Sequence, residues 1–313
     1  MSIHTVHRSQ NHLAWDKTLA PILNIQSGET VTFDCLDASN GQITPTSLPA
    51  SLATLDFTTL DQVSGPVHIA SALPGDTLQV DVLSIETAEW GWTGLFPGFG
   101  LLQDEFAGDT PALRIWKIDR ESGLAVWEGG EGGGTALKVT VRPFCGEMGV
   151  ARGLEGKWST IPPYNTGGNV DTRYLTAGST LYLPVEVEGA LFSCGDGHAA
   201  QGDGGTAIET PVKVSLRFTV LKNKPYTKTP HFHARNLPAE NEYYTTTGVD
   251  PDLKEATRAA VRHMIEFLVA EKGLSRVDAY MLCSVAGDLR LHEVVDMPNY
   301  VVGMMMPLSV FAS

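Results

Sequence analysis

The sequence predicts an α+β fold that is mainly β, with β-sandwich or barrel-like sheets and a smaller α/β part near the C-terminus. Three observations predict this class. Apolar and polar residues alternate between glycine and proline turns over residues 18–90, a β-meander pattern covers residues 116–144, and a long helical period occupies residues 250–272. We expect residues 1–215 to form a mainly β domain with most site motifs, and residues 216–313 to pack on it as an α+β part. At 313 residues, one unit with two subdomains is the open alternative.

The β-rich region is delimited by its turns. Residues 22–37, "ILNIQSGETVTFDCLD", alternate around a Ser-Gly turn, and residues 65–88 place Pro-Gly-Asp between two β-rich runs. Residues 91–110 mix aromatic side chains with glycines and a proline, which is typical of an ordered loop that lines a pocket or an interface. The run "GGEGGG" at residues 129–134 predicts a hairpin tip, because it lacks the Lys-Ser/Thr end of a phosphate-binding loop.

The helical region has clear boundary signals. Asp250 offers a cap, Pro251 suits the first helical position, and Gly273 predicts the end of the helix. A second helix is expected after the cap residue Ser275, and the chain then returns to strand. The three methionines of that last strand are expected to fill the core rather than to bind a cofactor; they are Met304, Met305 and Met306.

Charge and composition exclude several classes of protein. The formal net charge is −14, and no basic tract is dense enough to follow a phosphate backbone, so nucleic acid is not expected as a partner. No apolar run approaches the ~20 residues that span a bilayer, and the N-terminus lacks the apolar core of a secretory signal. We therefore expect a cytoplasmic protein without a membrane partner. The four cysteines form no CxxC pair, so reduced thiols of the core are expected.

The stretch "LFSCGDGHAAQGDGGTAIET", residues 191–210, carries the strongest chemical pattern. Asp196 and His198 are two residues apart, so on an extended backbone they share one face, as a metal site or an acid-base pair requires. Asp203 and Glu209 follow across a glycine-rich bend, where backbone N–H groups could face a developing oxyanion. A tight turn in which the aspartates only bind local backbone donors is the competing interpretation.

Other loops supply further polar side chains. Asp37 lies next to a Gly-Gln turn, Glu147 is isolated among small residues, and a Gly-Gly loop carries Asn165, Asn169 and Asp171. Each of them alone is consistent with a structural role. Together they place carboxylates and amides on loops between strands, where sites are commonly built.

Several established motifs are absent from the sequence. It has no GxSxG elbow, no HExxH helix and no GxGxxG after an early strand. His231 and His233 form a second same-face pair, but no nearby carboxylate or cysteine completes a ligand set, so packing is the preferred interpretation. Hydrolysis by an activated water, or binding without chemistry, are the two functions left.

At family level the sequence resembles the acetamidase/formamidase family over nearly its whole length. The specific blocks are "STIPPYNTGGNVDTRYLTAGSTLYLPVEVEGALFSCGDGHAAQGDG", "FCGEMGVA", "GTAIETP" and the segment that ends in "LRLHEVVD". The resemblance implies an amidase that hydrolyses short aliphatic amides to ammonia and a carboxylic acid. It also implies a mainly β fold and assembly as a homo-oligomer.

Site roles follow from the same resemblance. It implies catalytic roles for Glu147, Asn169, Asp171 and His198, with Asn169 or loop N–H groups on the oxyanion. A divalent metal, zinc or calcium, is implied on Asp37, Asp196 and His198. Contacts with a small amide substrate are implied for Asn165, Gly167, Gly168 and Asp203.

One segment departs from the family pattern. Members usually read Gly-Asp-Gly-Glu, then two residues, then Gly-Thr, whereas this chain passes from Gly204 directly to Gly205, so three positions that include a glutamate are absent. If that glutamate were essential, Glu147 or Glu209 would have to replace it. Two alternatives therefore stay open, namely a non-catalytic small-molecule or metal-binding scaffold and a hydrolase of another C–N bond such as that of a cyclic amide.

Overall fold

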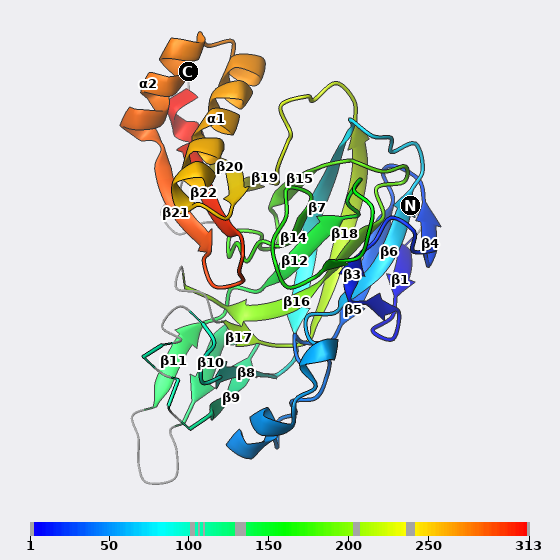
Figure 1. Cartoon of the computed structure of the whole chain (residues 1–313), viewed down its shortest axis with the longest axis vertical. Helices are drawn as coiled ribbons and strands as arrows, with labels where there is room; N and C mark the ends of the chain where they lie inside the picture. The colour runs from blue at the N-terminus through cyan, green and yellow to red at the C-terminus, as the bar shows by residue number, and fades with distance from the viewer. Residues whose placement is uncertain are drawn as a thin grey trace.

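The computed structural model describes residues 3–100, 104–105, 107–108, 110–128, 136–202, 207–235 and 242–311 of the chain. β-Strands are the predominant secondary structure of these residues and two α-helices follow late in the chain, which confirms the predicted α+β, mainly β class. The helices lie at one end of the molecule and the strands of residues 90–140 at the opposite end (Figure 1). Among the described residues, none of the helices is both long enough and apolar enough to cross a membrane.

A nine-stranded sheet runs through both expected parts of the chain. Its first two strands are parallel, and the other neighbours pair antiparallel. The expected boundary between residues 215 and 216 falls inside one of its strands, so the two parts share this sheet. In spatial order the strands are β1 (Ile3–Val6), β5 (Thr30–Cys35), β18 (Val212–Leu221), β7 (Thr77–Thr87), β15 (Thr180–Pro184), β19 (His231–Ala234), β20 (Tyr243–Asp250), β22 (Tyr300–Pro307) and β21 (Asp288–Glu293).

An eleven-stranded sheet carries the candidate site. Its main path is β11 (Leu137–Thr140), β10 (Leu124–Trp127), β9 (Ala112–Asp119), β8 (Trp90–Leu95), β17 (Ile208–Glu209), β16 (Phe192–Ala200), β12 (Phe144–Val150) and β14 (Gly167–Asn169). Strand β6 (Val63–Ile69) also pairs with β16, and with β2 (Asn11–His12) and β4 (Leu23–Ile25). A separate pair joins β3 (Ala14–Trp15) to β13 (Trp158–Ser159).

The main core lies between the two large sheets. Phe33 of β5 and Phe218 of β18 meet Phe192 of β16, with ring centroids 4.9 to 6.3 Å apart in edge-on arrangements. Aromatic pairs prefer this geometry, and such burial is the main stabilising contribution of the core. Because β16 is held from this side by packed rings, its polar side chains are placed on a rigid support.

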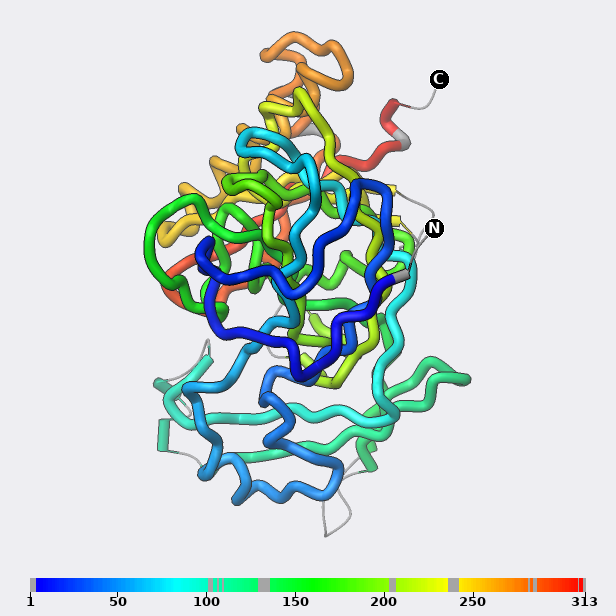
Figure 2. The backbone as a smooth tube through the Cα atoms, turned by 90° about the vertical axis from the view of Figure 1, so that its right-hand side faces the viewer, coloured from blue at the N-terminus to red at the C-terminus, as the bar shows by residue number. Residues whose placement is uncertain are grey.

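A smaller apolar cluster fills the end of the molecule opposite the helices. The short 3-10 helices η1 (Pro49–Thr54) and η2 (Phe57–Thr59) lie beside β8 and β9 in this region (Figure 2). Leu52 of η1 packs with Trp92 and Leu113 of these two strands. This packing fixes the start of the loop that follows β8.

The helices begin and end close to the predicted residues, with one correction. Helix α1 (Leu253–Lys272) is capped by Asp252, whose carboxylate accepts from the N–H groups of Lys254 and Glu255, so the predicted cap at Asp250 is two residues too early. Gly273 ends the helix in the left-handed conformation, as predicted. Helix α2 (Arg276–Ala286) follows the predicted cap Ser275, and a short 3-10 helix, η3, covers Leu308–Phe311.

Several smaller predictions are confirmed. All four cysteines are free and buried, and the three methionines of β22 lie in the core. His231 packs against Tyr244 as expected, whereas His233 lies 3.0 Å from Glu242, a carboxylate that the sequence analysis did not place beside it. Strands β10 and β11 form the predicted hairpin, but residues 129–134 at its tip lie outside the described residues.

Candidate active site

Three adjacent strands bring the polar side chains of the site together. Strand β16 lies between β12 and β17, and the pairing register sets Glu147 opposite Gly195 and His198 opposite Glu209. Strand β14 on the far side of β12 sets Asn169 opposite Glu147. The predicted site residues Glu147, Asn169 and His198 therefore lie on neighbouring strands of one sheet.

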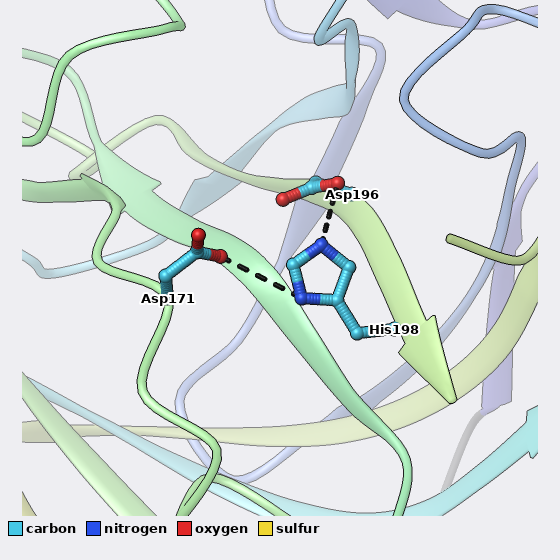
Figure 3. A group of neighbouring side chains, drawn as sticks. All are labelled: Asp171, Asp196 and His198. Atoms are coloured by element: carbon cyan, nitrogen blue, oxygen red, sulfur yellow. Dashed lines mark hydrogen bonds and ion pairs between the residues drawn. The ribbon is translucent and has the colours of Figure 1, made fainter. Parts of the chain in front are cut away.

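The imidazole of His198 lies at the centre of a buried acidic cluster (Figure 3). Its Nε2 is 3.0 Å from Asp196 Oδ1 and 3.1 Å from Glu209 Oε2, while its Nδ1 is 3.6 Å from Asp171 Oδ1. The sequence predicted the meeting of Asp196 with His198. It did not predict that Asp171 and Glu209 would reach the same ring.

These neighbours determine the charges within the cluster. Burial alone would lower the pKa of His198, but the charges of Asp196 and Glu209 outweigh burial and hold that pKa well above its ordinary value. Burial would likewise raise the pKa of Asp196, yet the charge of His198 and its hydrogen bond bring it below the usual value. Without a bound cation, protonated His198 and ionised Asp196 therefore form a buried ion pair, whereas an imidazole that holds a metal is neutral.

The other acids around this ion pair have raised pKa values. Burial raises the pKa of Asp171 well above its ordinary value, and it raises the pKa of Glu209 to about 7. Burial and the charges of Asp61 and Asp196 also raise the pKa of Glu147. Both carboxyl oxygens of Glu147 are buried and have no hydrogen-bond partner among the described residues. The cluster therefore contains groups that can hold a proton beside groups that can accept one.

Asp61 and Asp296 complete the cluster, and the sequence analysis singled out neither of them. Burial raises the pKa values of both groups well above the ordinary range, with further contributions from the charge of Asp196 and, for Asp296, first from that of Glu293. Asp296 closes the block "LRLHEVVD", so its place in a recognised block was an available signal. Asp61 had no such signal, because its surroundings in the sequence contain no histidine and no glycine-rich turn.

Three aspartates of the cluster have an uncommon backbone conformation. The φ angles of Asp61, Asp171 and Asp196 are +53°, +46° and +50°, in the left-handed region. Aspartate enters this region more readily than most residues, but the conformation still costs roughly 1 to 3 kcal/mol per residue. Such conformations persist where the surrounding structure requires them, and two of these aspartates, Asp171 and Asp196, place a carboxylate against the imidazole of His198.

The sequence matches the acetamidase/formamidase family over residues 3–155 and 151–313. The chain belongs to this family. The formamidase of Methylophilus methylotrophus is 26% identical over 366 residues, which cover 96% of this chain and 89% of that protein. The acetamidase structure from Bacillus halodurans superposes with a TM-score of 0.85 at 29% identity and covers 98% of both chains. The acetamidase structure from Yersinia enterocolitica gives 0.84 at 30% identity and covers 100% of this chain and 94% of that one.

The amide N–H groups of Asn169, expected from the sequence to face an oxyanion, both have partners in the structure of this family member. Its Nδ2 donates to the backbone carbonyl of Ile161 at 2.9 Å and to Asp296 Oδ2 at 3.0 Å. A carbonyl only accepts, so the first contact fixes the orientation of the amide, and the two contacts use both of its hydrogens. The buried Oδ1 has no partner among the described residues, so Asn169 can offer a substrate an acceptor and no donor.

Two predicted residues lie away from the acidic cluster of this family member. Asp37 accepts from the backbone N–H of Ser39 at 2.9 Å and from Trp92 Nε1 at 3.1 Å, and its carboxylate is not among the ligand atoms that lie within 4.8 Å of one another. The group of described residues that could hold a metal ion contains Asp171 in place of the expected Asp37. Asn165 is exposed and lines a separate surface cavity with Leu154.

The remaining predicted substrate contacts have other positions. Gly167 and Gly168 lie in β14, and a side chain on either would collide with the backbone of β12 or with Trp15. Their role in the structure is thus the close approach of β14 to its neighbours. Asp203 lies outside the described residues.

The donor set of the family chain fits a divalent cation. Ligand atoms of Asp171, Asp196 and His198 all lie within 4.8 Å of one another. Asp171 Oδ1 and His198 Nδ1 are buried without a hydrogen-bond partner among the described residues, which is the environment in which a cation replaces hydrogen bonds. Two carboxylates with one imidazole match the oxygen and nitrogen ligands of zinc sites.

Proposed function

We propose that this amidase hydrolyses the C–N bond of a short aliphatic amide at the cluster around His198, with release of ammonia and a carboxylate. The observation that carries the proposal is the buried His198 between Asp171, Asp196 and Glu209 in a chain of the acetamidase/formamidase family. No GxSxG elbow is present in the sequence, so water rather than a serine is the proposed nucleophile.

The protonation states in the cluster suit amide hydrolysis. Resonance makes the amide carbonyl a poor electrophile and the amine a poor leaving group, so the site must take a proton from water and give one to nitrogen. Glu209, whose pKa burial raises to about 7, can accept the proton of water near neutral pH. Glu147, whose pKa burial raises well above its usual value, can hold the proton that the leaving nitrogen requires.

Asp171, Asp196 and His198 would hold the divalent metal, and the imidazole favours zinc over calcium, which prefers oxygen ligands. A zinc ion in such a site polarises the carbonyl and lowers the pKa of water toward ~7. Ionised Asp196 would keep His198 oriented in the absence of substrate through their 3.0 Å contact. The shortened segment lacks the family glutamate. Glu147 and Glu209 are nevertheless in the site and can supply carboxylates for proton transfer.

A panel of amides with matched variants tests the proposal. Formamide, acetamide, propionamide and a γ-lactam are incubated with the purified chain, and ammonia release and bound metal are measured on the same sample. We expect release from the linear amides, loss of release on chelation, and recovery with zinc.

Asp196→Asn and His198→Asn are expected to lower ammonia release at least 100-fold and to reduce the metal content, with an unchanged circular dichroism spectrum. His233→Asn, a histidine of β19 outside the cluster, serves as the control. Full turnover in the two cluster variants would remove the proposed site. No release from any amide, with metal restored, would favour the binding scaffold.

Two further properties are proposed from the family resemblance. We propose a homo-oligomer, because symmetric assemblies are common among such enzymes, and a cytoplasmic location. Sedimentation of the purified chain measures the first property, and fractionation of cells that express it measures the second. A monomer, or recovery outside the cytoplasmic fraction, would overturn the respective proposal.

A further inference from the structure

An apolar cavity of about 380 Å³ lies beside the acidic cluster. Three separate segments of the chain form its walls. They are the loop after β8, the segment before β14, and the segment between β21 and β22. The described residues that line it include Phe99, Ile161, Val295, Asp296, Met297 and Tyr300.

The cavity reaches the cluster through Asp296 and Asn169. Asp296 lines the cavity, and its Oδ2 accepts from Asn169 Nδ2 at 3.0 Å. The same Nδ2 also binds the carbonyl of Ile161, which is another residue of the cavity wall. Asn169 stands opposite Glu147 in the strand register, so its side-chain amide links the cavity wall to the strand that carries Glu147.

The wall of the cavity is mixed in polarity. Asp296 is the one acidic residue among its described lining residues, whereas Ile161, Val295 and Met297 contribute apolar side chains. Phe99 comes from the aromatic loop for which the sequence predicted a place in a pocket wall or an interface. Ligand pockets of enzymes combine such an apolar body with a few polar groups at the reacting end, and ~300 Å³ is the lower limit of their usual volume.

We propose that this cavity is the acyl subsite of the amidase and that it selects primary amides with an apolar acyl chain of about three to five carbons. The inference rests on the proposed function and specifies its substrate. The carboxamide would lie at the cluster, where the unpartnered Oδ1 of Asn169 can accept from the substrate N–H. The alkyl chain would be buried against the apolar side chains of Ile161, Val295 and Met297.

The proposal sets a scale for substrate preference. Each methylene that moves from water to an apolar wall is worth a factor of about four in binding. We therefore expect kcat/KM to rise from acetamide to pentanamide by up to about 50-fold, and to fall again when the chain exceeds the cavity. A subsite that is absent would leave kcat/KM flat or falling along this series.

Substitutions of Ile161 test the subsite in two directions. Its backbone carbonyl holds Asn169, so a change of the side chain keeps that hydrogen bond available. Ile161→Phe fills the cavity and is expected to lower the ratio of kcat/KM for pentanamide to that for acetamide at least tenfold. Ile161→Ala enlarges the cavity and is expected to move the preferred chain length upward. Leu154→Phe, on an exposed leucine beside the distant Asn165 cavity, is the matched control.

A binding measurement separates failure of the subsite from failure of the amidase function. Calorimetric titration with pentanamide and acetamide is made on each variant that shows no turnover. If both Ile161 variants release ammonia and keep the wild-type ratio of kcat/KM for pentanamide to that for acetamide, the subsite is overturned and the amidase function stands. If the wild type releases no ammonia but binds pentanamide, and Ile161→Phe loses this binding, the subsite is supported and the amidase function is overturned. Equal pentanamide binding in wild type and Ile161→Phe overturns the subsite.

Discussion

At the residue scale, Gly146 shows how closely the backbone approaches the acidic cluster. A Cβ atom at this position would lie 2.4 Å from Asp171 Oδ1 and 2.9 Å from His198 Cε1, and it would also overlap the carboxylate of Asp196. Real Cβ atoms do not come this close to other atoms, so the cluster needs a glycine in the middle of β12.

The substitution Gly146→Ala is expected to displace the cluster side chains and to lower ammonia release at least 100-fold. Overpacking of this kind also costs about 1 to 3 kcal/mol of the free energy of unfolding. Steady-state kinetics and urea unfolding measure the two effects. Gly108→Ala is the control, since a Cβ there meets no atom within 4 Å. Equal activity of the two variants would contradict the described packing.

The sequence predicted part of this cluster for a local reason. Asp196 and His198 are near neighbours in the chain, so their meeting needs only one strand. Asp61 and Asp296 come from distant segments, and Glu209 lies on the strand that follows β16, so the proximity of all three depends on strand pairing and loop paths. Asp37 was grouped with the metal ligands on resemblance alone, but its carboxylate binds Ser39 and Trp92 instead.

At the scale of the element, the start of α1 distinguishes two candidate caps. Asp250 and Asp252 are both aspartates before an apolar period, and the sequence pattern with Pro251 favoured the first. In the structure, Asp252 receives the helix N–H groups, while Asp250 accepts from the N–H of Asp252. The pattern predicted the helix, and the hydrogen bonds determine where it begins.

The two aspartates give a matched pair of variants. Asp252→Ala is expected to lower the free energy of unfolding by about 1 kcal/mol, because two N–H groups of the first turn lose their acceptor. Asp250→Ala is expected to have a smaller effect, since it removes one hydrogen bond outside the helix. Urea unfolding of both variants measures the difference. A larger loss in Asp250→Ala would place the cap where the sequence predicted it.

At the scale of the whole molecule, buried neutral histidines link stability to pH. Burial lowers the pKa of His231 and that of His292 to about 3, from 6.5 in the unfolded chain. Below pH 6.5 the unfolded chain binds protons that these folded residues do not bind. The stability that the two histidines confer is therefore present above pH 6.5 and is lost as the pH falls toward 3.

Each of these histidines is expected to make the free energy of unfolding about 2 kcal/mol lower at pH 5 than at pH 7. His231→Gln should remove its share of this pH dependence, whatever its effect at pH 7. Urea unfolding at both pH values gives the comparison, with His7→Gln as the control on an exposed histidine. The same difference between the two pH values in His231→Gln and in the wild type would contradict the assignment.

The fold class was predictable, because alternation and turn residues are local signals. The strand order was not, since β18 lies between β5 and β7, which are far from it in the chain. The same holds for the order β17-β16-β12-β14 in the other large sheet, which brings residues 147, 169, 198 and 209 together and sets the geometry of the site. Sequence patterns specify the parts of this molecule, and non-local pairing assembles its chemistry.

The left-handed conformation of three cluster aspartates limits how this site can change. Among natural substitutes, glycine and asparagine tolerate positive φ best, and both of them remove negative charge. Substitutions at Asp61, Asp171 and Asp196 can therefore remove negative charge from the site with little backbone strain. They cannot introduce a longer acidic side chain at these positions without such strain. A longer acid has to stand on an ordinary strand position, as Glu147 and Glu209 do. New specificities in this scaffold should accordingly arise from those two glutamates and from the cavity wall.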